Sequence, residues 1–183
     1  MLQQTQVSRV LSFYERFLER FPTLEALAGA RPGRVMEAWA GLGYYARARN
    51  LHKLARQVTR DSRPGALPAH PDELLKLPGV GAYTAGAVAS FAHERRAALV
   101  DTNVARVLTR VFAPRLQPNR GRDLAKLWKI AEQILPRTGK ATWVHNQAVM
   151  ELGALVCTAR VKRCDACPVR VVCADFGRRA AKG

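Results

Sequence analysis

Four cysteines lie within a short stretch near the end of the chain, and their spacing is typical of a metal or cluster site. Cys157, Cys164, Cys167 and Cys173 form the pattern C-x6-C-x2-C-x5-C. In a reducing compartment such a group indicates metal binding rather than disulfides. Four thiolates can hold zinc tetrahedrally, or each can bind one corner of a cubane iron–sulfur cluster. The stretch has a single C-x2-C pair, whereas zinc sites usually show two similar pairs, so spacing alone leaves both metals open.

Asp101 is the second position with chemical potential, because it directly precedes a helix predicted over residues 104–111. Its carboxylate could stabilise positive charge that develops on a substrate. It could also simply cap the helix, since Asp is favoured at the N-cap. Asn103 follows and can hydrogen-bond this carboxylate or a water beside it. Arg106 and Arg110 are four residues apart and are predicted to share one helical face.

A helix-turn-helix segment over residues 74–92 is predicted to position Asp101. Gly79, Val80 and Gly81 form a turn between a short helix that includes Leu74 and an apolar helix over residues 83–93. The two glycines permit positive φ and let the backbone approach a ligand closely. Unpaired N–H groups at the start of the second helix attract anions. We therefore expect the turn to hold a nucleic-acid phosphate without recognising a base.

Composition supports a polyanionic partner. The chain has 183 residues, with 30 Lys and Arg against 14 Asp and Glu, which gives a net charge of +16. This length suffices for one domain or two small ones with a buried core. The positive charge makes nucleic acid the expected partner. We expect an intracellular protein with no membrane association, because the chain has no long apolar run and no signal-peptide pattern.

The spacing of apolar residues predicts an all-α fold, because few segments alternate with a period of two. Residues 44–50 are predicted to form a turn rather than a helix. The predicted helices cover residues 5–20, 23–28, 32–40, 51–60, 74–77, 83–93, 104–111, 124–135 and 144–156.

Four motifs together carry a resemblance to known proteins. LPGVG followed by an aspartate before an NVxRV helix resembles the helix-hairpin-helix DNA glycosylase superfamily. The segments MLQQTQV and GLGYYARARNLHK resemble the MutY-type adenine glycosylases, and the cysteine stretch after NQAVMELGALVC is similar to the cluster loop of MutY and endonuclease III. The resemblance implies a six-helix domain over residues 1–112 with the hairpin at about 74–92. It also implies a helical iron–sulfur domain over residues 113–183, with a structural 4Fe–4S cluster in the loop 157–173.

The resemblance implies a base-excision repair enzyme that hydrolyses the N-glycosidic bond of adenine mispaired with 8-oxoguanine or guanine. The adenine would be flipped out of double-stranded DNA, and Asp101 would stabilise the sugar cation electrostatically or by transient covalent attack. Asn103 and Tyr83 would assist. Tyr83 occupies the place where endonuclease III enzymes carry a lysine that attacks the sugar, and a phenol is protonated at neutral pH. This difference predicts a monofunctional hydrolase.

Further residues are assigned to DNA by the same resemblance. Side-chain amides can pair with exposed base edges, so the N-terminal glutamines are expected at the lesion. Gln4 would wedge into the duplex, Tyr44 would stack beside the lesion, and Leu2 would lie in the adenine pocket. The predicted DNA contacts are Gln3, Gln4, Thr5, Leu42, Tyr44, Gly79, Val80 and Gly81.

Two alternatives remain at the level of the sequence. A thymine or uracil mismatch glycosylase could share the hairpin, Tyr83, Asp101 and the cluster, although the segment MLQQT favours adenine. The family also carries an upstream segment with a general-acid glutamate and a C-terminal lesion-recognition domain. We therefore expect a chain truncated at both ends, which could be a catalytically impaired DNA-binding fragment. The expected setting is a monomer in the bacterial cytoplasm, associated with the nucleoid through DNA.

Overall fold

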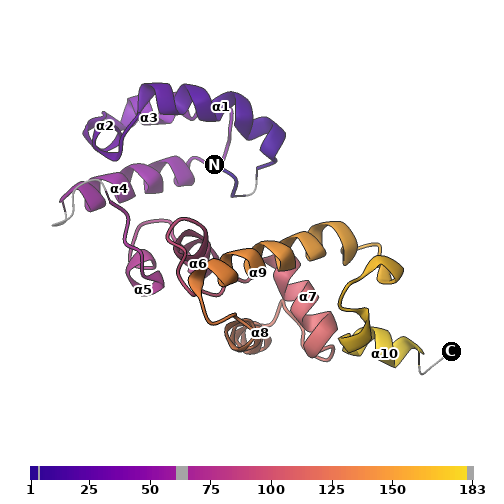
Figure 1. Ribbon diagram of the computed structural model, residues 1–183. Helices are drawn as coiled ribbons and strands as arrows, with labels where there is room; N and C mark the ends of the chain where they lie inside the picture. Colours follow the sequence, from indigo (N-terminus) through magenta and orange to yellow (C-terminus); the bar gives the residue numbers. More distant parts are fainter. Residues whose placement is uncertain (4, 61–65, 181–183) are drawn as a thin grey trace. The chain divides into compact units, whose positions relative to one another are not determined.

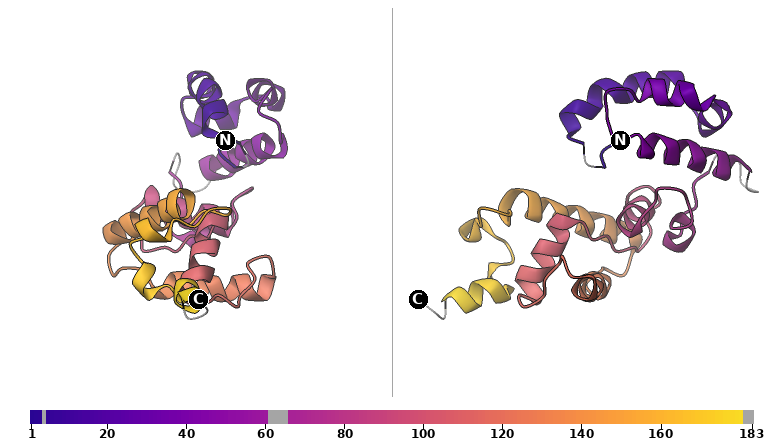
Figure 2. Two further views of the ribbon diagram at one scale, coloured as in Figure 1. Left: turned by 90° about the vertical axis from the view of Figure 1, so that its right-hand side faces the viewer. Right: turned by 180° about the vertical axis from the view of Figure 1, so that it is seen from behind.

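The structure is a computed structural model that describes residues 1–183 except 4, 61–65 and 181–183 (Figure 1). The described residues form helices joined by loops, with no strand beyond an isolated antiparallel bridge between Cys157 and Lys162. The all-α prediction is confirmed. Figures 1 and 2 show the α-helices, which are α1 (Val7–Arg20), α2 (Leu24–Gly29), α3 (Pro32–Ala38), α4 (Ala46–Arg60), α5 (Pro71–Leu74), α6 (Ala82–Phe91), α7 (Thr102–Phe112), α8 (Gly121–Gln133), α9 (Gly139–Glu151) and α10 (Ala174–Ala180). Between α9 and α10 lie the π-helical turn η1 (Leu152–Val156) and the 3-10 turns η2 (Cys164–Ala166) and η3 (Arg170–Val172).

The predicted turn over residues 44–50 is wrong in its second half. Helix α4 begins at Ala46, five residues before the predicted start at Leu51. Alanine and arginine are good helix formers, and Ala48 is fully buried, so packing supports the earlier start.

The chain forms two compact units. The first comprises Met1–Pro68 with Glu73–Val80, and the second comprises Ala69–Asp72 with Gly81–Gly183. This division rests on compactness and differs from the boundary expected at residue 112, which stays a prediction.

In the first unit, α4 packs against α2 and α3, and α1 packs against α3. The core is aromatic at its centre. Phe17 lies with its ring centroid 5.0 Å from that of Phe21 and 5.7 Å from that of Trp39. Such tilted and edge-to-face pairs add to the stabilisation from burial. The core consists of Phe17, Phe21, Leu27, Val35, Trp39, Leu42, Ala48 and Ala55.

In the second unit, α7 is the central helix and contacts α8, α9, η1 and α10. Figures 1 and 2 both show α7 between α8 and α10. Its buried face carries Val104, Ala105, Val107, Leu108 and Val111, which is the spacing of an amphipathic helix. Because α7 is packed on several sides, its N-terminal end, which Asp101 caps, is held in place within this unit.

Gly86 permits a close approach that fixes α6 against the loop before α7. A Cβ atom at this position would lie 1.9 Å from the carbonyl oxygen of Ala98.

We predict that Gly86→Ala lowers the free energy of unfolding by roughly 1–3 kcal/mol, because the backbone must move to make room for the added methyl group. Urea unfolding followed by circular dichroism would measure the change.

Gly121→Ala is the matched control, since nothing lies within 4 Å of a Cβ atom there. It should be neutral or stabilising by roughly 0.4–1 kcal/mol. Equal urea midpoints for the two variants would show that α6 does not depend on this contact.

Candidate functional site

Asp101 is the N-cap of α7, and its carboxylate is held from two sides. Its Oδ1 accepts a hydrogen bond from the backbone N–H of Val104 at 2.7 Å. Its Oδ2 accepts from the side-chain amide of Asn103 at 3.3 Å. The capping role considered from the sequence is therefore present, and it also fixes the direction of the carboxylate. The catalytic roles of Asp101 and Asn103 stay predictions.

Tyr83 lies in the first turn of α6, half-buried against the core around Leu99 and Val104. Burial of the side chain, and secondly the negative charge of Asp101, raise the pKa of its hydroxyl above the ordinary value. Both effects disfavour the phenolate. Tyr83 is therefore protonated throughout the neutral range and can donate a hydrogen bond near Asp101.

Arg106 links the start of α7 to the end of α9. Its Nη2 donates to Oδ1 of Asn103 at 2.7 Å and to the carbonyl oxygen of Gly153 at 2.6 Å. Its Nε donates to the carbonyl oxygen of Cys157 at 2.9 Å. Hydrogen bonds thus run continuously from the Asp101 carboxylate to the backbone of the first cysteine. The sequence predicted only that Arg106 lies on a helical face. Its position three residues after Asn103, which puts the two side chains within reach, was the signal for this further role.

The π-helical turn η1 makes this link geometrically possible. The N–H of Cys157 donates to the carbonyl of Leu152 at 2.7 Å, a span of five residues. A Cβ atom on Gly153 would lie 2.9 Å from Cβ of Asn103, so glycine allows η1 to approach α7. π-helical turns inside helices are frequent at functional sites.

Arg110, one turn further along α7, holds the loop that follows Cys157. Its Nη1 donates to the carbonyl oxygens of Thr158 at 2.7 Å and Cys157 at 3.2 Å, and lies 3.2 Å from the Cys157 sulfur. The Cys173 sulfur lies 3.5 Å from the carbonyl oxygen of Arg110. One helix therefore contacts both ends of the cysteine stretch.

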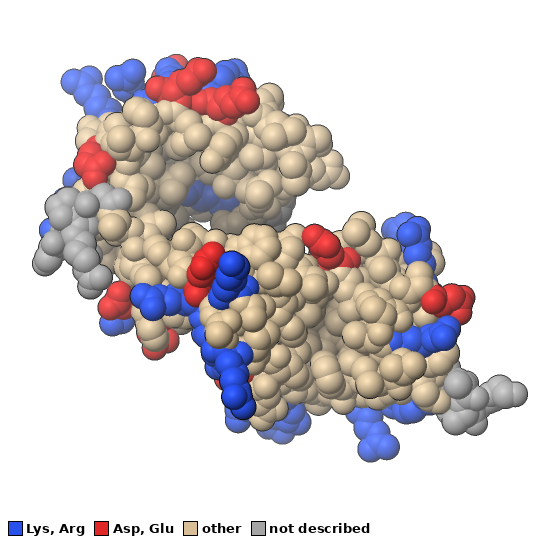
Figure 3. Space-filling model, viewed as in Figure 1, with Lys and Arg blue, Asp and Glu red and all other residues tan. Residues whose placement is uncertain are grey.

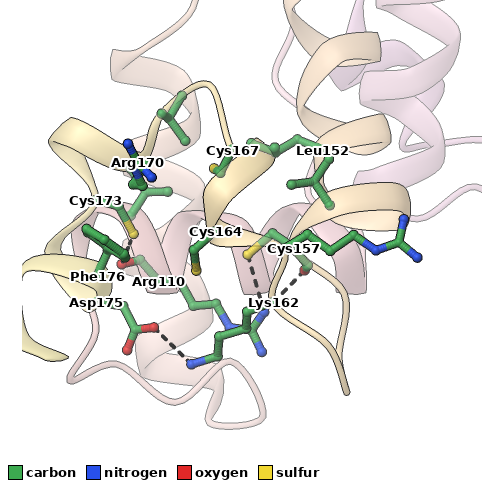
Figure 4. A pocket seen from close by; sticks show the side chains of 14 residues that line it. Arg110, Leu152, Cys157, Lys162, Cys164, Cys167, Arg170, Cys173, Asp175 and Phe176 are labelled. Carbon is green, nitrogen blue, oxygen red and sulfur yellow. Dashed lines mark hydrogen bonds and ion pairs between the residues drawn. The ribbon is translucent and has the colours of Figure 1, made fainter. Parts of the chain in front are cut away.

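All four cysteines are free, partly exposed, and line one cavity, which Figure 4 shows. Basic side chains at its wall can offset thiolate charge, and apolar ones exclude water. Among the described residues, however, no three His, Cys, Asp or Glu side chains converge closely enough to hold one metal ion. The four cysteine sulfurs suit a cluster that is bound by several thiolates. The assignment of these cysteines as its ligands stays a prediction. The cavity is also lined by Arg110, Leu152, Val156, Lys162, Arg163, Val169, Arg170 and Phe176.

The hairpin glycines differ from each other. Gly79 has φ +77°, and a Cβ atom there would lie 2.7 Å from Cβ of Asn50, so glycine is required. Gly81 has φ −93° and is the N-cap of α6, so only Gly79 adopts the positive φ that both glycines permit. The N–H of Val80 donates to the carbonyl of Leu77 at 3.2 Å. Gly81 has no side chain with which to cap α6, which leaves the helix start accessible to an anion.

The predicted lesion-contact residues have different environments. Leu2 and Tyr44 are exposed at 58 % and 62 %, and Gln3 is also exposed. Thr5 has a buried hydroxyl with no hydrogen-bond partner, whereas Gln4 lies outside the described residues. Leu42 is only 4 % exposed and packs in the core of the first unit. A side-chain contact between Leu42 and DNA would require it to leave that core.

Comparison with known proteins places the chain in a family. Residues 1–133 match the HhH-GPD superfamily of base excision DNA repair proteins. The chain belongs to this superfamily. The match covers the hairpin and Asp101, and it confirms the fold expected from the sequence motifs.

Relatives and solved structures of the HhH-GPD chain agree with this assignment. It is 44 % identical to human adenine DNA glycosylase over 94 % of its length, but covers only 31 % of that protein. It is 46 % identical to adenine DNA glycosylase of Mycolicibacterium smegmatis, covering 92 % of the chain and 56 % of the relative. A thermostable thymine-DNA glycosylase structure has a TM-score of 0.84 at 29 % identity, covering 97 % and 80 %. An endonuclease III–DNA covalent intermediate has a TM-score of 0.77 at 27 % identity, covering the same shares.

The surface of this HhH-GPD chain is basic but has no single patch on the face shown. Figure 3 shows Lys and Arg side chains dispersed over that face, with fewer acidic ones between them. Of the helices within the described ranges, none is long and apolar enough to cross a membrane.

The Arg106 link yields a stability prediction. Arg106→Met leaves Asn103 and two carbonyl oxygens without their donor, so the free energy of unfolding should fall by about 2–3 kcal/mol. Thermal unfolding followed by near-ultraviolet circular dichroism would measure it.

The matched control is Arg122→Met, which removes an exposed arginine from α8. It should change stability by less than about 0.5 kcal/mol. A loss as large for Arg122 as for Arg106 would mean that general charge, not the link, is responsible.

Proposed function

We propose that the chain is the catalytic part of a base-excision DNA glycosylase that hydrolyses the N-glycosidic bond of adenine mispaired with 8-oxoguanine or guanine. The observation that carries this proposal is the oriented carboxylate of Asp101, held by Val104 and Asn103 near the protonated Tyr83. The similarity to adenine DNA glycosylases supports the choice of base. Since the chain spans about a third of the human relative, the activity of the whole protein is part of the proposal.

In the proposed reaction the adenine leaves the duplex stack before the bond breaks. Positive charge then develops on the sugar, and the Asp101 carboxylate stabilises it through space. Asn103 and the N–H of Val104 keep the carboxylate directed, and water adds to the sugar to complete hydrolysis. Tyr83 supplies a hydrogen-bond donor and no amine, so no Schiff base forms with it.

Protonation of the departing adenine is a separate requirement, and a general acid typically contributes on the order of 10²–10⁴-fold. Asp101 is poorly placed for that role, because both of its oxygens accept hydrogen bonds. Both oxygens thus serve as hydrogen-bond acceptors, which suits a stabiliser of cations. We therefore assign the acid to another group.

A thymine mismatch glycosylase is the second candidate, favoured by the structural match to a thymine-DNA glycosylase. The identity of 44 % to an adenine enzyme, against 29 % for the thymine enzyme, favours adenine. Substrate comparison would decide between them.

The proposed DNA contacts follow from the resemblance to MutY-type glycosylases, and the exposure of Leu2, Gln3 and Tyr44 supports three of them. The hairpin backbone at Gly79, Val80 and Gly81 would bind a phosphate, and such contacts position the protein without reading sequence. We assign contacts at the mispair to Leu2, Gln3, Gln4, Thr5 and Tyr44. For Leu42 we assign an indirect role, in which its packing in the core of the first unit supports the turn that carries Tyr44.

We further propose that the protein acts as a monomer on chromosomal DNA in the cytoplasm of a bacterium.

For the cysteine site we propose a 4Fe–4S cluster bound by Cys157, Cys164, Cys167 and Cys173. Such a cluster, when bound, would hold the loop 157–173 together by its iron–sulfur bonds. Within this loop Lys162 pairs with Asp175 at 2.9 Å, and Arg170 lies 3.6 Å from Asp165. The exposed Arg160 and Arg163 are therefore the better candidates for phosphate contacts.

The catalytic proposal predicts a separation of binding from chemistry. In the native protein, Asp101→Asn should slow single-turnover adenine release from an A:8-oxoguanine duplex by about 10²-fold or more. Duplex affinity should be nearly unchanged, because Asn also caps helices well. Asp72→Asn, an exposed carboxylate outside the site, is the control and should act at the wild-type rate.

Two results would contradict the proposal in different ways. Wild-type release of adenine by the Asp101→Asn variant would remove Asp101 from the mechanism. Faster base release from T:G than from A:8-oxoguanine would establish the thymine alternative.

The cluster proposal predicts about four irons per chain and visible absorbance in the purified native protein. Cys164→Ser should lower the iron content, measured by elemental analysis. Val171→Ser, at a position 89 % exposed in the same loop, should retain iron. One zinc per chain without iron would overturn the assignment and favour the zinc alternative.

A further inference from the structure

The turn that presents Tyr44 has an unusual backbone. Gly41 has φ +97°, Gly43 has φ +71° and Tyr44 itself has φ +49°. Glycine adopts such values readily, but a bulky residue rarely does. Tyr44 is also 62 % exposed, so burial of its ring cannot account for this conformation. The conformation must be held by neighbouring groups.

The guanidinium of Arg47, in the first turn of α4, is the main such group. Its Nη2 donates to the carbonyl oxygens of Leu42 and Gly43, both at 3.3 Å. Its Nη1 donates to the carbonyl oxygen of Met1 at 2.6 Å and also to that of Gln3. One side chain therefore joins the backbone of the turn to the backbone of the N-terminal segment.

Aromatic rings enclose the same guanidinium. Its central carbon lies 5.5 Å from the ring centroid of Trp39 and 5.2 Å from that of Tyr44. Trp39 is 1 % exposed and itself donates from Nε1 to the carbonyl oxygen of Gly43 at 3.1 Å. Tyr44 is thus attached through Arg47 to the core, while most of its surface stays open to solvent. Cation–π contacts of this type add to the hydrogen bonds.

The geometry points to Arg47 as a positioning residue that fixes Tyr44 and residues 1–3 as one surface for recognition of the mispair. This inference rests on the proposed function, because only a DNA substrate gives that surface its role. Arg47 acts through its neighbours, since its Nη1 and Nη2 bond carbonyl oxygens and its Nε is buried without a partner. A lysine keeps the charge but lacks the planar fork that bonds several carbonyls at once.

The variant Arg47→Lys distinguishes a positioning role of Arg47 from a simple phosphate contact. If Arg47 positions the surface, Arg47→Lys and Arg47→Gln should both lower the preference for A:8-oxoguanine over A:G duplexes by about 10- to 100-fold in single-turnover adenine release. Tyr44→Ala should cause a similar loss. Combining Tyr44→Ala with Arg47→Gln should add little, because the two residues act as one unit.

Arg49→Lys and Arg49→Gln are matched controls from the same helix turn, where the side chain is exposed. They should keep the wild-type preference. A phosphate contact at Arg47 would give a different pattern: Arg47→Lys would resemble wild type, and Arg47→Gln would weaken all duplexes equally with a smaller salt dependence. That pattern, or additive losses with Tyr44→Ala, would overturn the inference.

Hydrogen exchange without DNA provides a readout that is independent of catalysis. Amides of residues 41–46 should exchange faster in Arg47→Lys than in wild type, and at the wild-type rate in Arg49→Lys. Unchanged exchange in Arg47→Lys would overturn the positioning role even if activity fell. If wild-type protein released no adenine, the proposed function and the recognition role would both fail, while exchange would still decide whether Arg47 holds the turn.

Discussion

The second unit depends on the hydrogen bonds that Arg106 donates between two helix ends. At one end lies the cap of α7, where Asn103 contacts the Asp101 carboxylate, and at the other lies the backbone of η1 and Cys157. Partly buried hydrogen bonds from a charged donor are stronger than neutral ones. They connect the orientation of the Asp101 carboxylate to the position of Cys157, where the cysteine loop begins. Under the proposed function, this coupling makes the cysteine loop part of the support of the catalytic carboxylate.

At several places in this protein an arginine side chain joins two segments by donating hydrogen bonds to backbone carbonyl oxygens. Arg47 bonds carbonyls of a turn, Arg110 bonds carbonyls after Cys157, and Arg96 bonds the carbonyls of Pro136, Leu135 and Glu132 at the end of α8. A guanidinium suits these positions because its fork reaches several acceptors. These guanidinium groups therefore contribute to the fold through hydrogen bonds to backbone carbonyl oxygens. Because these acceptors are neutral, the groups keep their positive charge and still count toward the net charge of +16.

Sequence patterns predicted the features that are encoded locally. The helices with strong apolar spacing and the cap at Asp101 depend on residues within one turn of each other. The misplaced start of α4 arose where the local sequence permits both a turn and a helix. The roles of Arg47 and Arg106 could not be predicted in this way, because their acceptors lie up to 46 and 51 residues away. Leu42 shows the same limit, since its burial depends on a core that includes Phe17 and Phe21, which lie far from it in the sequence.

The π-helical turn η1 has a consequence for insertions and deletions. A regular α-helix rotates by about 100° per residue, so a turn that closes over five residues holds one residue more than the regular spacing. Removing any one residue from Leu152–Val156 would let α9 continue as a regular helix and would turn Cys157 by about 100° around the axis. Its carbonyl would then face away from Arg106 and its sulfur away from the other three cysteines. The length of this short segment is therefore under tighter constraint than most of its side chains, and homologous chains should vary here by substitution and not by indel.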